Sequence, residues 1–420
     1  MKIYFFDLDR YLNNDVIELS PLFSVEKIED YLFYIDELSL DEKSRFFMYS
    51  DYFLKKIFLF SEKINLNRFN EDKQIYFKTS RKIKFERNRL VLLMNDSCNL
   101  NCEFCFTKKG NNLIDFEKIK PFLDNFIKMN VFSDEIYVFF TSLGEVMLNF
   151  GNVKKITKYL SDNLLRAAIN YSLITNLTIL NDEILEFFKK YNFSLIVSYD
   201  GPGILSRRRY NPKIEKTVLF NLKRIDQLDL LSRVNVVIGK DHINRKEEVF
   251  SFFGKYGNKV SFIPVLYFDR DSKRVFSEIS FEEYYSFMKD FYFRVSGVDL
   301  KTFLKKKLNP QVCSFKYNIF PDYKIYLCGI EHFYGVKYNK LIDDLSIGSI
   351  FDHDYLNYDY LTKVDPYIDD CKSCFYHLFC SACRPLHSTF GPFKCFSKTL
   401  VKDLLKVILR QYFLNFLSKN

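Results

Sequence analysis

Three closely spaced cysteines are the residues in this chain best suited to do chemistry. Cys98, Cys102 and Cys105 lie in the run Ser-Cys-Asn-Leu-Asn-Cys-Glu-Phe-Cys-Phe, with the spacing C-x3-C-x2-C. One short loop with this spacing can place three thiolates on a single iron–sulfur cluster and leave its fourth iron open. An open iron can bind a small molecule and pass it an electron, whereas a closed structural zinc site has no vacant position.

The other seven of the ten cysteines all follow residue 312. They are Cys313, Cys328, Cys371, Cys374, Cys380, Cys383 and Cys395. A secreted disulfide protein would spread its cysteines and begin with an apolar signal segment. The start of this chain has no such segment and reaches an acidic residue at Asp7. We therefore expect a cytoplasmic protein with metal-bound thiolates.

Length and charge narrow the class of protein further. A chain of 420 residues can bury a full-sized core and is expected to form two or three domains. The formal charge of +9 comes from scattered lysines, and no nucleic-acid-binding signature accompanies it. No window is apolar for long enough to span a membrane. We expect neither a nucleic-acid partner nor a membrane partner.

Strand and helix patterns alternate through the middle of the chain. The expected strands are Leu90–Met94, Ile136–Thr141, Ala168–Thr175, Ser194–Ser198, Val234–Ile238 and Val260–Tyr267. The expected helices are Asp115–Met129, Val153–Leu165, Asp182–Tyr191, Glu215–Leu228, Arg245–Tyr256 and Phe281–Val295. Continuous apolar strands indicate a parallel sheet covered on both faces. Six β/α units fall short of a closed barrel of eight, so the pattern predicts an α/β fold with a partial (β/α)6 TIM barrel.

The cysteine loop follows the first expected strand, and in such barrels the chemistry lies at the carboxyl ends of the strands. We expect the barrel to span residues 86–298. Residues 1–85 should form an α+β extension, with strands at Lys2–Phe6 and Val16–Leu19 and helices near Glu26–Leu38, Asp41–Tyr49 and Tyr52–Lys63. Residues 299–420 should form a loop-rich, cysteine-rich domain that ends in an amphipathic helix around Leu404–Phe416, packed on the barrel.

Residues 88 to about 396 resemble radical S-adenosylmethionine (SAM) enzymes with a C-terminal SPASM domain. The C-x3-C-x2-C loop after the first strand, with Phe104 directly before the third cysteine, carries most of the resemblance. It implies that Cys98, Cys102 and Cys105 hold a [4Fe–4S] cluster beside Phe104, and that SAM chelates the open iron. Reduction would then yield a 5′-deoxyadenosyl radical, with the protein positioning the cofactor and excluding water.

The loop after the second strand is similar to the family's Gly-Gly-Glu-Pro segment, which meets the SAM amino group. Gly144 and Glu145 match that segment, whereas Leu143 replaces the first glycine and Val146 the proline. The resemblance implies that Gly144 and Glu145 bind SAM, and the two replacements put the geometry of the loop in question.

Two later motifs stand at the ends of the next two strands. Thr175-Asn176-Leu177 is similar to the family's Thr-Asn-Gly, with the glycine lost. Ser198-Tyr199-Asp200-Gly201-Pro202 resembles its Ser-x-Asp-Gly-Pro segment. The resemblance implies that Asn176 contacts SAM, that Ser198 and Asp200 meet its ribose, and that one of Arg207, Arg208 and Arg209, taken here as Arg208, meets its carboxylate.

The C-terminal cysteines match the SPASM pattern for two auxiliary iron–sulfur clusters. By resemblance, one cluster takes Cys371, Cys374, Cys380 and Cys395, and the other takes Cys313, Cys328 and Cys383. Tyr323 stands where a glycine normally precedes the second of these cysteines. The alternative is zinc, because C-x2-C pairs are common zinc knuckles and His377 or His387 would complete a second site.

The resemblance favours an enzyme that crosslinks, epimerises or forms a thioether in a ribosomally made peptide. Its partners would be a peptide with leader and core and an electron donor of flavodoxin or ferredoxin type. Residues 1–85 would either bind the leader or form a plain structural cap. One alternative is an oxidoreductase of a protein side chain, as in sulfatase maturation, against which Gly329 counts because that family has an aspartate there. The others are a SAM-radical oxidoreductase of a small alcohol or sugar and a non-catalytic iron–sulfur electron carrier.

Overall fold

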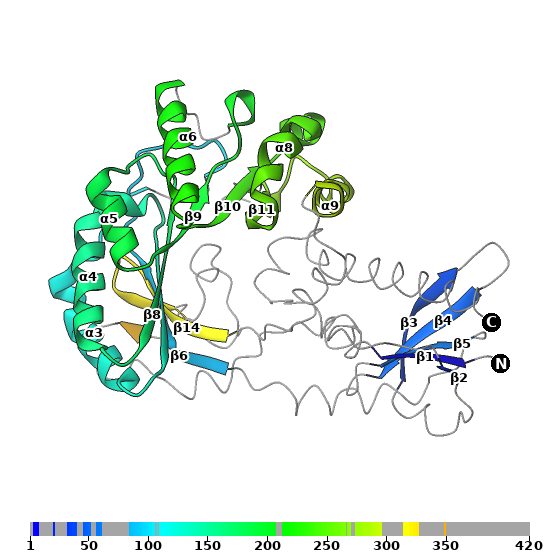
Figure 1. The fold of residues 1–420 in the computed structure, drawn as a ribbon, viewed down its shortest axis with the longest axis horizontal. Helices are drawn as coiled ribbons and strands as arrows, with labels where there is room; N and C mark the ends of the chain where they lie inside the picture. Colours follow the sequence, from blue (N-terminus) through cyan, green and yellow to red (C-terminus); the bar gives the residue numbers. More distant parts are fainter. Residues whose placement is uncertain are drawn as a thin grey trace.

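The structure is a computed structural model, and it describes part of the chain. The described residues are 3–7, 20–21, 32–39, 45–51, 56–60, 84–105, 107, 109–206, 212–265, 267–269, 274–295, 314–326 and 348–349. Within them the strands form a large sheet, a separate five-stranded sheet and a two-stranded ribbon (Figure 1). The ribbon pairs β12 (Tyr267–Asp269) with β13 (Arg274–Phe276).

The large sheet contains the six expected strands in sequence order. They are β6 (Lys84–Leu93), β7 (Glu135–Thr141), β8 (Ala168–Thr175), β9 (Ser194–Ser198), β10 (Leu231–Ile238) and β11 (Val260–Pro264). Every neighbouring pair among them is parallel. The described strands end at β11 on one side without closing on themselves. The prediction of an open, partial barrel is confirmed.

Three further strands extend the sheet beyond β6. β14 (Ser314–Ile319) pairs parallel with β6, and β15 (Lys324–Tyr326) and β16 (Gly348–Ser349) follow in antiparallel order. Residues that follow position 298 thus add to the barrel's own sheet.

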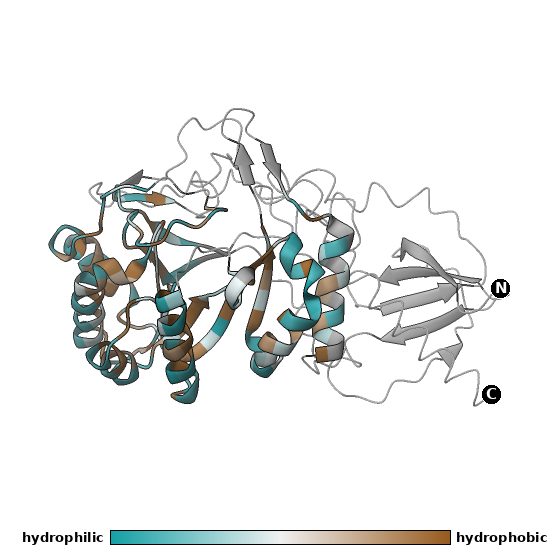
Figure 2. Ribbon diagram, turned by 90° about the horizontal axis from the view of Figure 1, so that it is seen from above, coloured by the Kyte–Doolittle hydropathy of each residue, from teal (hydrophilic) through white to brown (hydrophobic). Residues whose placement is uncertain are grey.

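The helices follow the strands as expected and lie along the sheet (Figure 1). They are α3 (Phe116–Asn130), α4 (Phe150–Asn163), α5 (Asp182–Lys190), α6 (Pro212–Gln227), α7 (Lys240–Asn244), α8 (Lys246–Phe253) and α9 (Phe281–Asp290). The 3-10 turn η1 (Val146–Asn149) precedes α4, and a π-helical turn, Phe291–Val295, follows α9. Figure 2 shows hydrophilic and hydrophobic stretches on these helices, the pattern of amphipathic helices that cover a sheet.

Alternate residues of β6 enter two different apolar clusters. Leu90 and Leu92 are fully buried in the main core with residues of the helices. Val91 and Leu93 face the other side of the sheet, where Phe320 and Tyr326 pack against them. Because successive strand residues point to opposite faces, this strand needs apolar cover on both sides, which explains its continuous apolar sequence.

The N-terminal residues form an antiparallel sheet in the order β2-β1-β5-β4-β3. Its strands are β1 (Ile3–Asp7), β2 (Ser20–Pro21), β3 (Leu32–Ser39), β4 (Arg45–Asp51) and β5 (Lys56–Phe60). The expected first strand is confirmed to within a residue. The helices expected near Glu26–Leu38, Asp41–Tyr49 and Tyr52–Lys63 were wrong, because the structure has the strands β3, β4 and β5 there. Short runs rich in Phe, Tyr and Ile fit either element, and pairing with distant strands decided between them.

Several predictions fall outside the described residues. These concern Arg208, the strand at Val16–Leu19, the C-terminal helix and the seven cysteines from Cys313 to Cys395. Among the helices that the structure describes, none combines the length and the apolar character needed to cross a membrane.

Candidate functional site

The cysteine loop is closed at its base where it leaves β6. Asn95 forms an antiparallel bridge with Leu113. The Asp96 carboxylate accepts hydrogen bonds from Asn112 N at Oδ1 and from Asn112 Nδ2 at Oδ2, both 2.8 Å long. Asp96 N also donates to Asn112 O, at 3.2 Å, and Asp96 O accepts from Gly110 N, at 3.1 Å. Residues 96–112 therefore leave and return to the sheet at one point.

The three cysteines lie within this closed loop and form no disulfide. Cys98 and Cys102 are half-buried and Cys105 is exposed, with the half-buried Phe104 between the last two. Cys98 Sγ accepts a hydrogen bond from Leu100 N at 3.4 Å, and Cys105 Sγ lies 3.0 Å from the Thr107 hydroxyl. Thiols that are at least partly exposed in this way remain reachable by a ligand.

Burial is the main cause that raises the pKa of the Cys98 thiol above its ordinary value. The Leu100 N–H opposes that rise, the Glu145 carboxylate adds to it, and the Lys109 ammonium lowers the pKa. Lys109 Nζ donates to Leu100 O, so its cation is held within the cysteine loop.

The donor set fits a cluster of several irons. In the described part of the chain, no group of three His, Cys, Asp or Glu side chains is arranged to hold a metal ion. In a [4Fe–4S] cluster each cysteine binds a different iron, so the three sulfurs need not converge on one point. Three thiols on one closed loop suit that arrangement, and their assignment to a cluster remains a prediction.

The loop after β7 packs directly on the backbone of the cysteine loop. Leu143 N donates to Asn95 O at 2.9 Å, and Glu145 N donates to Ser97 O at 2.8 Å. A Cβ atom at Gly144 would lie 1.8 Å from Ser97 O and 2.4 Å from its carbonyl carbon. Only glycine allows this approach, which gives a physical reason why Gly144 is kept where the neighbouring motif positions differ.

Glu145 joins the ends of β7 and β8. Its side chain is buried, with 2% of the residue exposed. Oε1 accepts from the Thr175 hydroxyl at 2.6 Å and from Met147 N at 3.1 Å, and Oε2 accepts from Asn176 N at 2.7 Å. The predicted acceptor for the SAM amino group thus also fixes the protein's own loops.

A side-chain network ties the end of β8 to the cysteine loop. Asn176 Nδ2 donates to Asn99 Oδ1 at 2.9 Å, and Asn99 Nδ2 donates to the Thr178 hydroxyl at 2.7 Å. Between them, Leu177 has a φ of 59° and is 1% exposed. The residue that replaces the family's glycine therefore keeps the left-handed backbone that a glycine would adopt freely.

Asp200 links the end of β9 to β10. It is fully buried, and Oδ1 accepts a hydrogen bond from Val237 N at 2.8 Å. Its carbonyl oxygen lies 2.8 Å from His242 Nε2, while His242 Nδ1 accepts from Gly239 N at 3.3 Å. These partners require the neutral imidazole with the proton on Nε2. Ser198, the last residue of β9, is half-buried, and the ribose contacts predicted for Ser198 and Asp200 remain predictions.

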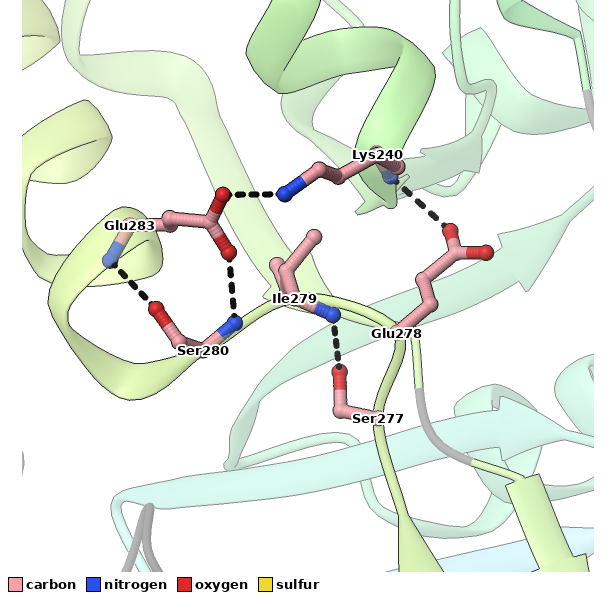
Figure 3. Close-up of polar contacts among 6 residues, drawn as sticks. All are labelled: Lys240, Ser277, Glu278, Ile279, Ser280 and Glu283. Carbon is pink, nitrogen blue, oxygen red and sulfur yellow. Dashed lines mark hydrogen bonds and ion pairs between the residues drawn. The ribbon is translucent and has the colours of Figure 1, made fainter.

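Figure 3 shows a polar cluster at the end of β10, which the sequence had not indicated. Lys240 N donates to Glu278 at 2.9 Å, and Lys240 Nζ pairs with Glu283. Glu283 and Ser280 also cap the start of α9 reciprocally. The cluster joins the first turns of α7 and α9 through these capping bonds and the ion pair of Lys240 with Glu283.

Asn149 is another residue whose role the sequence did not indicate. Its Nδ2 donates to Met94 O and to Ile114 O, both at 2.9 Å. The first carbonyl lies where the chain enters the cysteine loop and the second where it leaves. In the sequence, an Asn just before an apolar helix predicts a helix cap. Only the structure shows that Asn149 joins the two ends of the cysteine loop.

The structure brings together the cysteine loop, Gly144, Glu145 and Asn176 through direct contacts. Ser198 and Asp200 stand at the end of the next strand of the same sheet. These positions share the carboxyl edge of the parallel strands, where α/β barrels place their chemistry.

No protein-family model matches the sequence. The chain is 34% identical over 113 residues to an uncharacterised protein of Methanocaldococcus jannaschii, a match that covers 27% of this chain and 38% of that protein. It is 26% identical over 162 residues to the radical SAM cyclopropyl synthase TigE of Paramaledivibacter caminithermalis, a match that covers 34% of this chain and 30% of that enzyme. These matches therefore span well under half of either curated relative.

The fold is similar to that of anSMEcpe, solved with bound AdoMet and the Cp18Cys peptide. The TM-score is 0.56 at 17% sequence identity, over 76% of this chain and 98% of that structure. The open parallel barrel and the cysteine loop after its first strand agree with the partial sequence match to TigE. The chain therefore resembles radical SAM enzymes of the peptide maturase type.

Proposed function

We propose that this protein is a radical SAM enzyme that modifies a ribosomally made peptide. The observation that carries the proposal is the closed cysteine loop at the end of β6, held against the β7 loop by the contact of Gly144 with Ser97. The named activity of TigE and the peptide in the anSMEcpe structure support a substrate of this kind.

The roles of the site residues follow the resemblance to radical SAM enzymes. Cys98, Cys102 and Cys105 hold a [4Fe–4S] cluster, with Phe104 beside it. Glu145 and Asn176 bind SAM at the ends of β7 and β8, and Ser198 and Asp200 bind its ribose. Arg208, which lies outside the described residues, binds its carboxylate. When bound, the cluster and SAM supply one-electron reduction and a 5′-deoxyadenosyl radical. The protein orients SAM and keeps water from the radical.

The N-terminal sheet supports a role in peptide recognition. β3 is an eight-residue strand at the edge of that sheet. An edge strand offers unpaired backbone groups to which an extended leader can add as a further strand. We propose that residues 1–85 bind the leader of the substrate while its core enters the barrel.

The remaining elements of the proposal come from the resemblance to SPASM enzymes. The seven C-terminal cysteines bind two auxiliary clusters, and a flavodoxin or ferredoxin supplies the first electron. The enzyme works in the reducing cytoplasm, where thiolates remain available to metals. The reaction is a crosslink, a thioether or an epimerisation.

Incubation of the anaerobically reconstituted protein with SAM and dithionite tests the proposal. We expect 5′-deoxyadenosine to accumulate, and Cys98→Ala to abolish it. Ser161→Ala, on the outer helix α4, is the matched control and should retain it. Absence of 5′-deoxyadenosine above the Cys98→Ala level would contradict the proposal and would instead support a non-catalytic iron–sulfur electron carrier.

The peptide substrate is tested with synthetic copies of the short peptides encoded beside the gene. A mass change in one of them that requires SAM and Cys98 would support a peptide substrate. If SAM is cleaved but none of these peptides changes mass, the proposal of a peptide substrate is wrong, and small alcohols or sugars become the next substrates to test.

A further inference from the structure

The turn between β14 and β15 has an unusual residue at its end. Phe320 N donates to Lys324 O at 3.1 Å, and Tyr323 N donates to Phe320 O at 2.8 Å, which leaves the three-residue loop Pro321-Asp322-Tyr323. Hairpins of this length end on a left-handed residue that is usually glycine. Here Tyr323 has a φ of 63°, so an aromatic residue takes a backbone conformation that disfavours its side chain.

The Tyr323 hydroxyl makes two contacts far away in the sequence. It donates to Leu113 O and accepts from Asp115 N, both at 3.1 Å. Leu113 pairs with Asn95 at the base of the cysteine loop. Asp115 caps α3 by accepting from Glu117 N and Lys118 N. The tyrosine therefore holds the segment that joins the end of the cysteine loop to the start of the helix.

The surroundings fix the Tyr323 ring in this place. The ring packs against the main core, and the Lys118 ammonium lies 5.8 Å from its centre. Within β14 itself, Tyr317 meets Phe122 of α3 edge-to-face, with the ring centres 5.6 Å apart. The hairpin thus contacts α3 through packed rings as well as through the hydroxyl.

We propose that Tyr323 is a positioning residue for the cysteine loop, through which the C-terminal hairpin sets the geometry of the proposed SAM site. Cys313 directly precedes β14, and Cys328 is the second residue after β15. The hairpin is therefore the stretch of chain between two proposed ligands of an auxiliary cluster. A glycine at position 323 would form the turn with less strain but would leave the loop exit without this contact.

The link to the SAM site, with its kinetic and spectroscopic readouts, rests on the proposed function, whereas the contact of Tyr323 with the loop does not. Tyr323→Phe removes both hydroxyl contacts and keeps the ring. Tyr171→Phe is the matched control, because that hydroxyl also has two partners, Ser161 and Thr157 O of helix α4, and neither belongs to the cysteine loop. Tyr323→Gly restores the turn residue and removes the ring as well.

Hydrogen exchange of the full-length protein without SAM is the first measurement. Each lost hydrogen bond of ordinary strength corresponds to a change of up to about tenfold in a local opening equilibrium. We expect amides at residues 109–118 to exchange about tenfold faster in both Tyr323 variants and at the wild-type rate in Tyr171→Phe. Unchanged exchange at these residues in Tyr323→Phe would overturn the proposal.

The second measurement separates positioning from general stability. In Tyr323→Phe we expect the KM for SAM to rise severalfold with little change in kcat, and the SAM-induced change in the EPR spectrum of the reduced cluster to weaken. Tyr323→Gly should show the same changes even if its turn is more stable. Equal kinetics and spectra in wild type and both variants would refute the coupling to the SAM site. If the wild type does not cleave SAM, the proposed function fails, and the exchange data still decide whether Tyr323 holds the loop.

Discussion

Two buried or half-buried side chains occupy backbone positions that normally belong to glycine. Leu177 has a φ of 59° and Tyr323 a φ of 63°, and the sequence motifs expect glycine at both. A left-handed conformation costs most residues about 1–2 kcal/mol. Leu177 offsets this cost by burial in the main core, and Tyr323 by its ring packing and two hydrogen bonds. Both positions therefore have the left-handed backbone that a glycine would adopt freely.

Substitution of Leu177 tests this explanation. Leu177→Ala and Leu177→Gly should both destabilise the protein, by about 2–5 kcal/mol, because each empties the same buried space. Leu177→Gly should nevertheless be the more stable of the two by about 1 kcal/mol, since glycine has no strain at positive φ. Urea unfolding measures both free energies.

Leu185 is the matched control because it is equally buried but lies within α5. There the order should reverse, with Leu185→Gly about 1 kcal/mol less stable than Leu185→Ala. If alanine were also the better residue at position 177, strain at Leu177 would play no part.

Gly144 should tolerate no side chain. Its Cβ would fall 1.8 Å from Ser97 O, so Gly144→Ala must push the β7 loop away from the cysteine loop. We expect a loss of about 1–3 kcal/mol in stability and, after reconstitution, less iron bound and little SAM cleavage. Gly151→Ala, in α4 with open space around its Cβ, should instead be stabilising by about 0.5–1 kcal/mol. Thermal unfolding and iron analysis distinguish the two variants.

Among the elements, the joint between β6, η1 and α3 holds the site in place. Asn149 donates to the carbonyl oxygens of Met94 and Ile114, which belong to the two ends of the cysteine loop. The amide nitrogen of Asn149 suits this position because both of its partners are carbonyl oxygens, which only accept hydrogen bonds. A carboxylate of the same shape would face two carbonyl oxygens with no proton to donate.

Asn149→Asp should therefore be strongly destabilising near neutral pH, by about 2–4 kcal/mol. The new carboxyl group would have a pKa above its unfolded value of about 3.9. The deficit relative to wild type should thus be small below about pH 4, where both states are protonated, and grow as the pH rises. Urea unfolding at several pH values measures it, and a deficit independent of pH would contradict the explanation. Asn163→Asp, at an exposed position in α4, should change stability by less than about 0.5 kcal/mol.

The elements of the barrel were predictable because each has a strong local pattern. β8 and β9 have the predicted bounds, since their apolar runs begin and end sharply. β3, β4 and β5 were mistaken for helices because their short apolar runs gain their identity from pairing across the sheet. For such short apolar runs, only the pairing with other strands in the folded chain distinguishes a strand from a helix.

The site was predictable to the level of motif order and no further. The sequence placed Gly144, Glu145 and Asn176 at the ends of consecutive strands, and the structure confirms that these positions meet. It did not indicate Asp96, Asn112 or Asn149, because hydrogen bonds between distant residues leave no periodic pattern in a single chain. The sequence showed that Tyr323 replaces a glycine. It did not show that the Tyr323 hydroxyl bonds to Asp115, 208 residues away, where the chain leaves the cysteine loop.

At the scale of the whole molecule, strands β14 to β16, which follow the barrel in the sequence, extend the barrel's own sheet. β14 pairs with β6, so the strand that leads into the cysteine loop is flanked by β7 on one side and by the hairpin on the other. If the C-terminal cysteines bind metal as proposed, a change in that region would therefore reach the cysteine loop through a hydrogen-bonded neighbour. The proposed clusters should thus be separate in their ligands yet joined by the sheet.

Iron counting tests this division of the cysteines. If the loop and the C-terminal region hold three [4Fe–4S] clusters, the reconstituted protein should bind about twelve irons. Replacing Cys98, Cys102 and Cys105 together by alanine should remove about four of them and all SAM cleavage. Replacing Cys371 and Cys374 should also remove about four irons but leave some SAM cleavage, because the loop that binds SAM keeps its own ligands. Zinc in place of iron at the C-terminal cysteines would contradict the auxiliary clusters while leaving the loop cluster intact, since the two sets share no residue.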